Sequence, residues 1–241
     1  MSGNMLIPSI EKRLGALIES TRRNMSENEA GNQSGSKKLT ITISREFGCE
    51  TYPMAECLLN LMEKKTGDVW AIMDKGLLEE VAQSSDLSEK ILKNLGEKAG
   101  FLDEILATFA PTWRTEKDYF RLLSHHVISL ANAGNVILVG RGSASITQSM
   151  KNCYHFKMFA SMEFKIRSIA HRMELTHEEA EKLIHKKQHE RNMFIKDFLN
   201  QDPKDLSLYH IVFNNDKNRA EKIASTIMEY LLAESLTKKE M

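Results

Sequence analysis

The sequence has little of what marks secreted, metal-binding or membrane proteins. Its three cysteines, Cys49, Cys57 and Cys153, show neither metal-ligand spacing nor the pattern of a disulfide framework. No apolar run approaches the roughly 18 residues that a membrane-spanning helix needs, and there is no secretory segment. We therefore expect a cytoplasmic protein with no membrane contact and no metal site built from its own side chains.

An excess of either charge is also lacking. Lysine and arginine together number 33, and aspartate and glutamate also number 33, so the formal net charge is zero. A general nucleic-acid-binding surface is therefore not expected, although a local basic pocket is compatible with this balance. The 241 residues, of which 41% are hydrophobic and 27% charged, fit one globular domain with an extension.

The predicted extension covers residues 1–38. Apolar residues recur at helical spacing from Ile10 to Ile18, which predicts an amphipathic helix. Residues 25–38 are polar and rich in glycine and serine, as in a flexible linker. The helix would pack on the domain or on a second subunit of a homodimer, or it would dock a partner. We place the main domain at residues 39–236.

The chain is organised around residues 39–59. Five β-favouring residues, Leu39 to Ile43, predict a buried strand, a turn containing Gly48 follows, and Pro53 suits the first turn of a helix. The backbone N–H groups of such a turn and the positive end of the helix favour a phosphate. The turn has one glycine and no lysine, however, so a plain strand–helix connection is the alternative.

This stretch resembles the start of the cytidylate kinase-like family. There a strand runs into Ser-Arg-x-(Tyr/Phe)-Gly-Ser-Gly-Gly, a phosphate loop without lysine, and the match is carried by Ser44, Arg45, Phe47 and Gly48. Residues 49–51 depart from it, because cysteine, glutamate and threonine stand where the family has Ser-Gly-Gly. The resemblance implies that ATP, with Mg²⁺ on its phosphates, binds through Ser44, Arg45, Gly48, Cys49, Glu50 and Thr51.

A second strand is predicted at residues 69–73, followed directly by Asp74. The sequence Asp-Lys-Gly-Leu-Leu at this point resembles the family's Asp-Lys-x-Leu-(Leu/Ile). A carboxylate at the carboxyl end of a strand lies where open α/β sheets bind ligands. The resemblance implies that Asp74 binds the acceptor nucleotide, whereas the alternative is that Asp74 only caps the next helix.

Residues 76–133 are predicted to be helical and to end in a long core helix at 115–133. In nucleoside monophosphate kinases, which the chain resembles, the region between the second and third strands closes over the acceptor. Here it would do the same or form a dimer contact. The adjacent His125 and His126 lie about 100° apart on a helix. One should therefore be buried and the other exposed, and a shared metal ion is not expected.

Four apolar residues, Val136 to Val139, predict a buried third strand, and Gly140-Arg141-Gly142 follows it. The family carries the same Gly-Arg-Gly at this place. Arginine is always charged and binds phosphate oxygens through two parallel hydrogen bonds. Arg141 is therefore the strongest single candidate, both for catalysis and for binding the acceptor. The alternative is an arginine that bridges loop carbonyls.

The predicted lid covers residues 174–200, and a capping box at Thr176 opens its helix. The lid resembles that of the family at Arg191, whereas Gln188 stands in place of the family's aspartate. The resemblance implies that Lys187 and Arg191 are catalytic and neutralise the phosphoryl group during transfer. A solvated basic helix face is the alternative.

The remaining predicted elements are a fourth strand at 154–160, a helix at 162–173, a fifth strand within 205–215 and a final helix at 217–236. Strands that are separated by helices of a dozen or more residues require a parallel sheet with helices on both faces. The sequence therefore predicts a three-layer α/β/α domain with five parallel strands, and the resemblance implies that it is of the nucleoside-monophosphate-kinase type.

The resemblance implies phosphoryl transfer from ATP to CMP, dCMP or a similar acceptor. Two weakened motifs, at residues 49–51 and at Gln188, favour a rival: a catalytically weak or inactive relative that senses nucleotides or serves as an interaction scaffold. A kinase for another small phosphate acceptor is the third hypothesis. Nucleotides are the expected partners in the first two.

Overall fold

The computed structural model describes residues 38–78 and 116–237. The predicted helix at 10–18, the linker at 25–37 and the helical segment at 79–115 lie outside these ranges. The first described residue already belongs to the domain, because Asn152 Nδ2 donates a hydrogen bond to the carbonyl oxygen of Lys38 at 3.1 Å.

The described strands form a five-stranded sheet in the order β2-β3-β1-β4-β5, in which all neighbours are parallel. Their bounds are β1 Thr40–Arg45, β2 Ala71–Met73, β3 Val136–Val139, β4 Cys153–Phe159 and β5 Ile211–Asn214. Because parallel neighbours cannot be joined by a tight turn, each connection crosses over the sheet. The predicted parallel sheet is confirmed.

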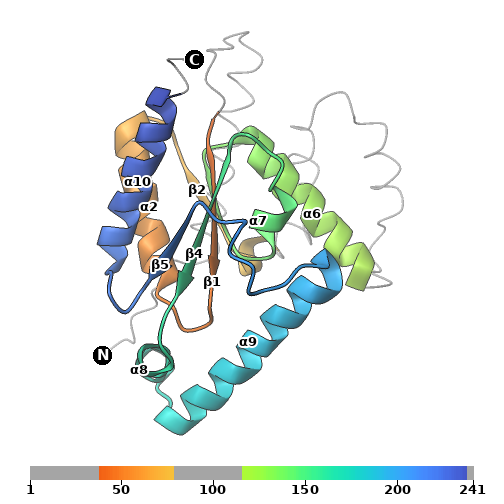
Figure 1. Cartoon of the computed structure of the whole chain (residues 1–241), viewed down its shortest axis with the longest axis vertical. Helices are drawn as coiled ribbons and strands as arrows, with labels where there is room; N and C mark the ends of the chain where they lie inside the picture. The colour runs from red at the N-terminus through yellow and green to blue at the C-terminus, as the bar shows by residue number, and fades with distance from the viewer. Residues whose placement is uncertain (1–37, 79–115, 238–241) are drawn as a thin grey trace.

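Helices cover both faces of this sheet (Figure 1). On one face lie α2 and α10, on the other α6 and α7, and α8 and α9 lie beyond the carboxyl ends of the strands. Their bounds are α2 Thr51–Thr66, α6 Glu116–Ala133, α7 Ser143–Ile146, α8 Met162–Met173, α9 His177–Leu199 and α10 Ala220–Thr237. The predicted three-layer α/β/α architecture is confirmed. In the described ranges, every helix is too short or too polar to cross a bilayer.

Each face of the sheet has its own hydrophobic core. Under α2 and α10, the alternating residues Ile41 and Ile43 of β1 are completely buried together with Phe156 of β4. Under α6, the core is built from the other half of the sheet and includes Met73 and Leu138. Because side chains alternate across a strand, Thr42 and Ser44 of β1 face the α6 side, and this makes part of that side polar.

The second strand is shorter than the sequence suggested, and the fifth is preceded by a loop. The backbone N–H of Trp70 donates to Glu63 Oε1 at 3.1 Å, and its indole N–H donates to Thr66 Oγ1 at 3.2 Å, so β2 begins only after it. The strand β5 lies within the predicted range 205–215, and residues 205–210 form its approach. The side chains of Asp202 and Asp205 accept hydrogen bonds from backbone N–H groups two residues on, which turns this segment into a loop.

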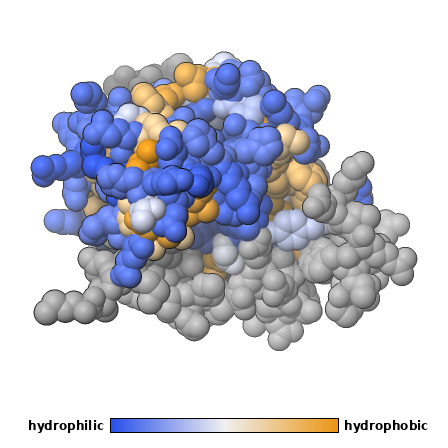
Figure 2. Space-filling view, turned by 90° about the horizontal axis from the view of Figure 1, so that it is seen from below, coloured by the Kyte–Doolittle hydropathy of each residue, from blue (hydrophilic) through white to orange (hydrophobic). Residues whose placement is uncertain are grey.

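The helix α9 begins as the sequence predicted. Thr176 Oγ1 accepts from the N–H of Glu179 at 3.3 Å, and a Glu179 carboxylate oxygen accepts from the N–H of Thr176 at 2.9 Å. Figure 2 shows the molecule from the side on which α8 and α9 lie. The described surface there is mostly hydrophilic, and hydrophobic residues appear only in small groups.

Candidate functional site

A cleft of about 1410 Å³ opens at the carboxyl ends of β1, β3 and β4 and runs between α9 and the 200–210 segment. Ligands of open α/β sheets bind at this edge. Of the predicted site residues, Ser44, Arg45, Arg141, Lys187 and Arg191 line the cleft. Gly48, Cys49, Glu50, Thr51 and Asp74 do not belong to its lining.

Arg45 leaves β1 and lays its guanidinium against Gly140. A Cβ atom at Gly140 would lie only 1.7 Å from Arg45 Nη1, so a side chain there would clash with the guanidinium. Gly140 also has a φ of +78°, a backbone conformation that glycine adopts without strain. The guanidinium has no hydrogen-bond acceptor among the described residues. Burial lowers its pKa to about 10, the carboxylate of Asp74 opposes this shift, and the charge of Arg141 adds to it.

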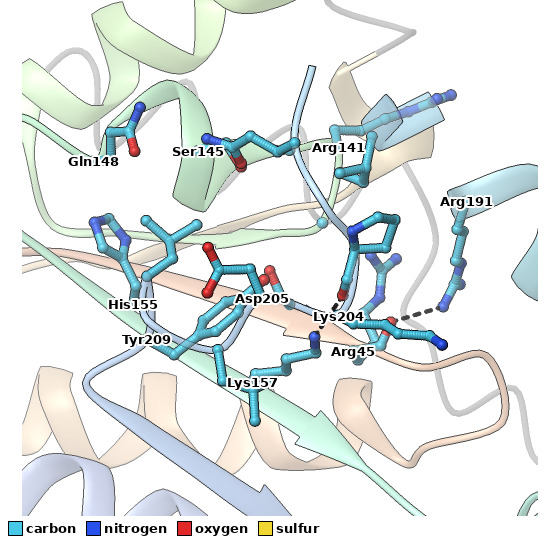
Figure 3. A pocket seen from close by; sticks show the side chains of 18 of the residues that line it. Arg45, Arg141, Ser145, Gln148, His155, Lys157, Arg191, Lys204, Asp205 and Tyr209 are labelled. Carbon is cyan, nitrogen blue, oxygen red and sulfur yellow. Dashed lines mark hydrogen bonds between the residues drawn. The ribbon is translucent and has the colours of Figure 1, made fainter. Parts of the chain in front are cut away.

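Two further arginines reach the same region from other elements (Figure 3). Arg191 of α9 donates from Nη1 to the carbonyl oxygen of Arg45 at 3.3 Å, and its guanidinium lies 5.1 Å from the ring centroid of Phe47. Burial and the charge of Arg45 lower the pKa of Arg191 to about 9. Arg141 follows β3, and its guanidinium lies 5.3 Å from the ring centroid of Phe194 on α9.

Like charges that converge repel one another, and at Arg45 the carboxylate of Asp74 does not fully offset the effects of burial and of Arg141. Neither Arg45 nor Arg191 forms a salt bridge with a carboxylate in the part of the chain that the structure describes. An anion with several oxygen atoms, such as a phosphate, would relieve the repulsion and accept charge-assisted hydrogen bonds. Strongly shifted cations in a cleft are typical of functional sites.

The turn between β1 and α2 is engaged by other parts of the protein. The N–H of Phe47 donates to Gln188 Oε1 at 2.9 Å, and the N–H of Glu50 donates to Asn215 Oδ1 at 2.8 Å. The N–H of Glu46 donates to the carbonyl oxygen of Met158 at 3.0 Å. These three donors of the predicted phosphate turn are therefore already satisfied by protein oxygens.

The helix α8 packs closely against the same turn. Gly48 has a φ of +103°, and a Cβ atom there would lie 2.7 Å from Lys165 Cβ, so a side chain at this position would displace α8. Lys165 Nζ is 2.8 Å from a carboxylate oxygen of Glu46. Arg172 donates to the carbonyl oxygen of Gly48 at 3.4 Å. A Gly48 substitution would therefore report on this packing as much as on phosphate binding.

The buried groups of the turn differ in what they offer a ligand. Burial raises the pKa of the Cys49 thiol to about 12, so it is a neutral, unreactive group. Thr51 Oγ1, at the first residue of α2, is buried and bonds no described group. A hydroxyl at this place suits the Mg²⁺ that accompanies ATP in phosphate-loop proteins.

Comparison with known proteins identifies the family of this chain. The family model described as the cytidylate kinase-like family matches residues 40–217. The chain belongs to the cytidylate kinase-like family. No curated protein matches. A solved structure of an uncharacterised protein from Eubacterium ventriosum is similar with a TM-score of 0.62 and 19% identity, over 82% of this chain and 99% of that one. That likeness is one of fold.

Two more distant structures also resemble this member of the cytidylate kinase-like family. Shikimate kinase from Bacteroides thetaiotaomicron has a TM-score of 0.46 and 13% identity, over 80% of this chain and 98% of that one. A structure from the PezAT chromosomal toxin–antitoxin system of Streptococcus pneumoniae has a TM-score of 0.34 and 12% identity, over 90% and 97% of the two chains.

The predicted acceptor residue Asp74 follows β2 directly, at the carboxyl end of the strand. Its Oδ1 accepts the N–H of Leu77 at 3.0 Å, which is the capping role named as the alternative. It also influences the pKa of Arg45 through charge. Lys187, predicted to be catalytic, lines the cleft and forms a salt bridge of 2.8 Å with Glu190 on the same helix.

Other cleft residues were missed by sequence reasoning. His155 and Lys157 of β4 line the cleft, as does Tyr209 in the 200–210 segment. The sequence signal for His155 and Lys157 was their spacing, because side chains two residues apart lie on the same face of a strand. That face is opposite the one that carries the buried Phe156. His126 is fully buried, as predicted for one of the two histidines, whereas His125 is half-buried and not exposed. The described residues include no group of metal-ligating side chains that could hold an ion.

Proposed function

We propose that the protein transfers a phosphoryl group from ATP to a phosphorylated acceptor, and that the acceptor is a nucleoside monophosphate such as CMP or dCMP. The observation that supports this proposal is the convergence of Arg45, Arg141 and Arg191 on one cleft at the carboxyl edge of the sheet. Catalysis of phosphoryl transfer depends on positioning and on neutralising negative charge, which is what fixed guanidinium groups do.

The basic residues of the cleft would have different roles because they come from different elements of the fold. Arg45 is held against the Gly140 backbone and near Asp74, so its position is fixed by the sheet. Arg191 and Lys187 come from α9 and would follow any movement of that helix. Mg²⁺ would neutralise the donor phosphates, and Thr51 would contribute its hydroxyl.

A second candidate function is that of a nucleotide sensor or interaction scaffold without turnover. The observation that favours it is that two N–H groups of the β1–α2 turn already have hydrogen-bond acceptors. Gln188 accepts from Phe47, and Asn215 accepts from Glu50. A triphosphate would have to displace both side chains before these donors could bind it. A kinase must do so in each cycle, whereas a scaffold can remain closed.

The deciding experiment is a titration of the full chain with ATP·Mg²⁺ and each nucleoside monophosphate, followed by calorimetry and by ADP formation. The kinase proposal expects saturable ADP formation that depends on CMP or dCMP. Binding heat without ADP formation would favour the sensor. If neither ATP nor any monophosphate produced heat or product, both functions would be contradicted.

A further inference from the structure

The cleft continues well beyond the arginines. It extends along the α6 side of the sheet, under the 200–210 segment, where Gln148, His155, Tyr209 and Asp205 belong to its lining. Figure 3 shows Gln148 and His155 at one end in this view and the three arginines at the other. The arginine end and this polar end, which carries Asp205 as well as uncharged groups, are parts of one cavity.

The polar end is held in a fixed shape by contacts that bind the 200–210 segment to the sheet. Lys157 Nζ donates to the carbonyl oxygen of Pro203 at 2.9 Å and lies 5.1 Å from the ring centroid of Tyr209. Ser145 of α7 donates to Gln201 Oε1. The segment therefore forms a roof whose anchors come from β4 and α7.

His155 is oriented so that one ring nitrogen remains for a ligand. Its Nδ1 is 2.8 Å from Thr42 Oγ1 of the neighbouring strand, and its backbone N–H donates to Nδ1 of His210 at 2.9 Å. Only 3% of the residue is exposed, and burial lowers its pKa to about 4, so the ring is neutral at pH 7. Its Nε2 has no partner among the described residues.

Gln148 supplies a second free polar group. It is exposed, and its side-chain amide forms no hydrogen bond with any described residue. The amide offers both a donor and an acceptor, as does a neutral imidazole in its two tautomers. In contrast, the carboxylate of Asp205 would repel a second negative group on a ligand in this half of the cleft.

The spacing of the two ends follows from strand register. Thr42 lies opposite His155, whereas Arg45 lies opposite Met158, so the ends are three residues apart along β1 and β4. At about 3.3 Å per residue this is roughly 10 Å. A small phosphorylated compound with a ring as its body can bridge such a distance.

We propose that the cleft binds a phosphomonoester with its phosphate on Arg45, Arg141 and Arg191 and its uncharged body under the 200–210 segment, hydrogen-bonded to Gln148 and His155. The body lies on the β4 side of Arg45, away from Asp74. This inference rests on the phosphate site of the proposed function. A nucleoside monophosphate and a sugar phosphate both have this chemistry, and the test below separates them.

The test uses calorimetry on the full chain with methyl phosphate, ribose 5-phosphate and CMP. Methyl phosphate has no polar body, so it should bind most weakly. Gln148→Leu should weaken ribose 5-phosphate or CMP by about 5-fold, as expected for one neutral hydrogen bond, and leave methyl phosphate unchanged. The neighbouring exposed residue Ser149, which does not line the cleft, provides the control Ser149→Leu, which should change none of the three.

The outcomes separate the subsite from the phosphate site beneath it. If Gln148→Leu weakens both polar ligands equally, the residue contacts the sugar; if it weakens CMP alone, it contacts the base. If all three ligands bind equally well, or Gln148→Leu changes none of them, the subsite is refuted while the phosphate site stands. If no phosphate compound binds, the proposed function fails as well.

Discussion

Gln188 of α9 and Phe47 of the β1–α2 turn are joined directly, since Gln188 Oε1 accepts the backbone N–H of Phe47 at 2.9 Å. The other end of the same amide donates to Asn192 Oδ1 at 2.9 Å, which fixes its orientation. The ring of Phe47 packs against the hydrophobic cluster between α8 and α9. The helix that carries Lys187 and Arg191 is thus tied to the turn that would receive the donor phosphates.

Gln188→Ala should bind ATP·Mg²⁺ more tightly than the native chain does. The substitution frees the N–H of Phe47 for a phosphate oxygen, and one such hydrogen bond corresponds to about a 5-fold change in affinity. The same change removes a native hydrogen bond, so the free energy of unfolding should fall by about 1 kcal/mol. Calorimetry and urea unfolding measure the two effects.

The exposed neighbour His189 supplies the control for this experiment, because His189→Ala leaves the turn untouched. It should change neither ATP affinity nor the urea midpoint. If Gln188→Ala lowered stability and left ATP affinity unchanged, the N–H of Phe47 would not be a phosphate ligand, and the sensor or scaffold function would gain weight.

Arg45→Met should make the unliganded protein more stable and abolish its response to phosphate. Arg45 is half-buried and has no hydrogen-bond acceptor among the described residues. Burial and the charge of Arg141 outweigh the attraction of Asp74 and lower its pKa, and Arg191 repels it as well. A methionine would keep most of the apolar stem and remove the repulsion, so the free energy of unfolding should rise by about 1 kcal/mol. Thermal melts with and without inorganic phosphate provide the measurement.

Arg167→Met is the matched control, since Arg167 is exposed and pairs only with Glu163 on its own helix. Its melting temperature should change little, and its response to phosphate should be that of the native chain. An Arg45→Met protein that melted several degrees lower, and still gained stability from phosphate, would show that Arg45 is a structural residue.

His155 should make the protein sensitive to mild acid. Burial, aided by the charge of His210, lowers the pKa of His155 to about 4, whereas an unfolded histidine has a pKa of about 6.5. As the pH falls from 6.5 toward 4, the unfolded chain binds a proton that the native chain does not, so stability falls. Between pH 7 and pH 5 the loss from this residue should be about 2 kcal/mol at most.

Urea unfolding of His155→Gln at both pH values checks this expectation. Glutamine can still bond Thr42 but does not titrate, so the stability difference between pH 7 and pH 5 should shrink. It should not vanish, because burial and the charge of His125 also lower the pKa of His126 to about 4. An unchanged pH dependence would mean that His155 is already protonated in the native protein or is solvated at pH 5.

The sequence predicted those features that depend on local patterns. The buried runs at Leu39–Ile43 and Val136–Val139 and the capping box at Thr176 correspond to β1, β3 and the start of α9. In contrast, the bond between Phe47 and Gln188 joins residues 141 positions apart, and no local pattern signals it. The resemblance had marked Gln188 as a departure but could not show what it contacts.

The polar end of the cleft was missed for a related reason. Strand pairing places His155 beside Thr42, and neither residue forms part of a motif. The sequence placed the fifth strand within 205–215 without showing where it begins, and Leu206 proves to be 50% exposed. Side-chain bonds from Asp202 and Asp205 to the backbone outweigh the strand propensity of this segment and create the roof of the cleft.

The last prediction tests whether Arg141 binds phosphate or only stabilises the fold. Arg141→Ala should weaken phosphate and nucleotide binding by about 10- to 100-fold, because charge-assisted hydrogen bonds contribute roughly 1.5–3 kcal/mol. Arg141→Lys should recover only part of this affinity, since an ammonium group cannot form the two parallel bonds of a guanidinium. Calorimetry with inorganic phosphate and CMP measures both variants.

The structural role of Arg141 predicts a different pattern. Its guanidinium covers the ring of Phe194 on α9, and a cation–π contact of this kind contributes about 0.5–1 kcal/mol. Arg141 also has a φ of +54°, a strained value that alanine shares, so Arg141→Ala removes the guanidinium without relieving the backbone. If this variant bound phosphate normally but melted several degrees lower, Arg141 would serve to anchor α9. The phosphate would then depend on Arg45 and Arg191 alone, and the acceptor site would lose the residue that the sequence ranked first.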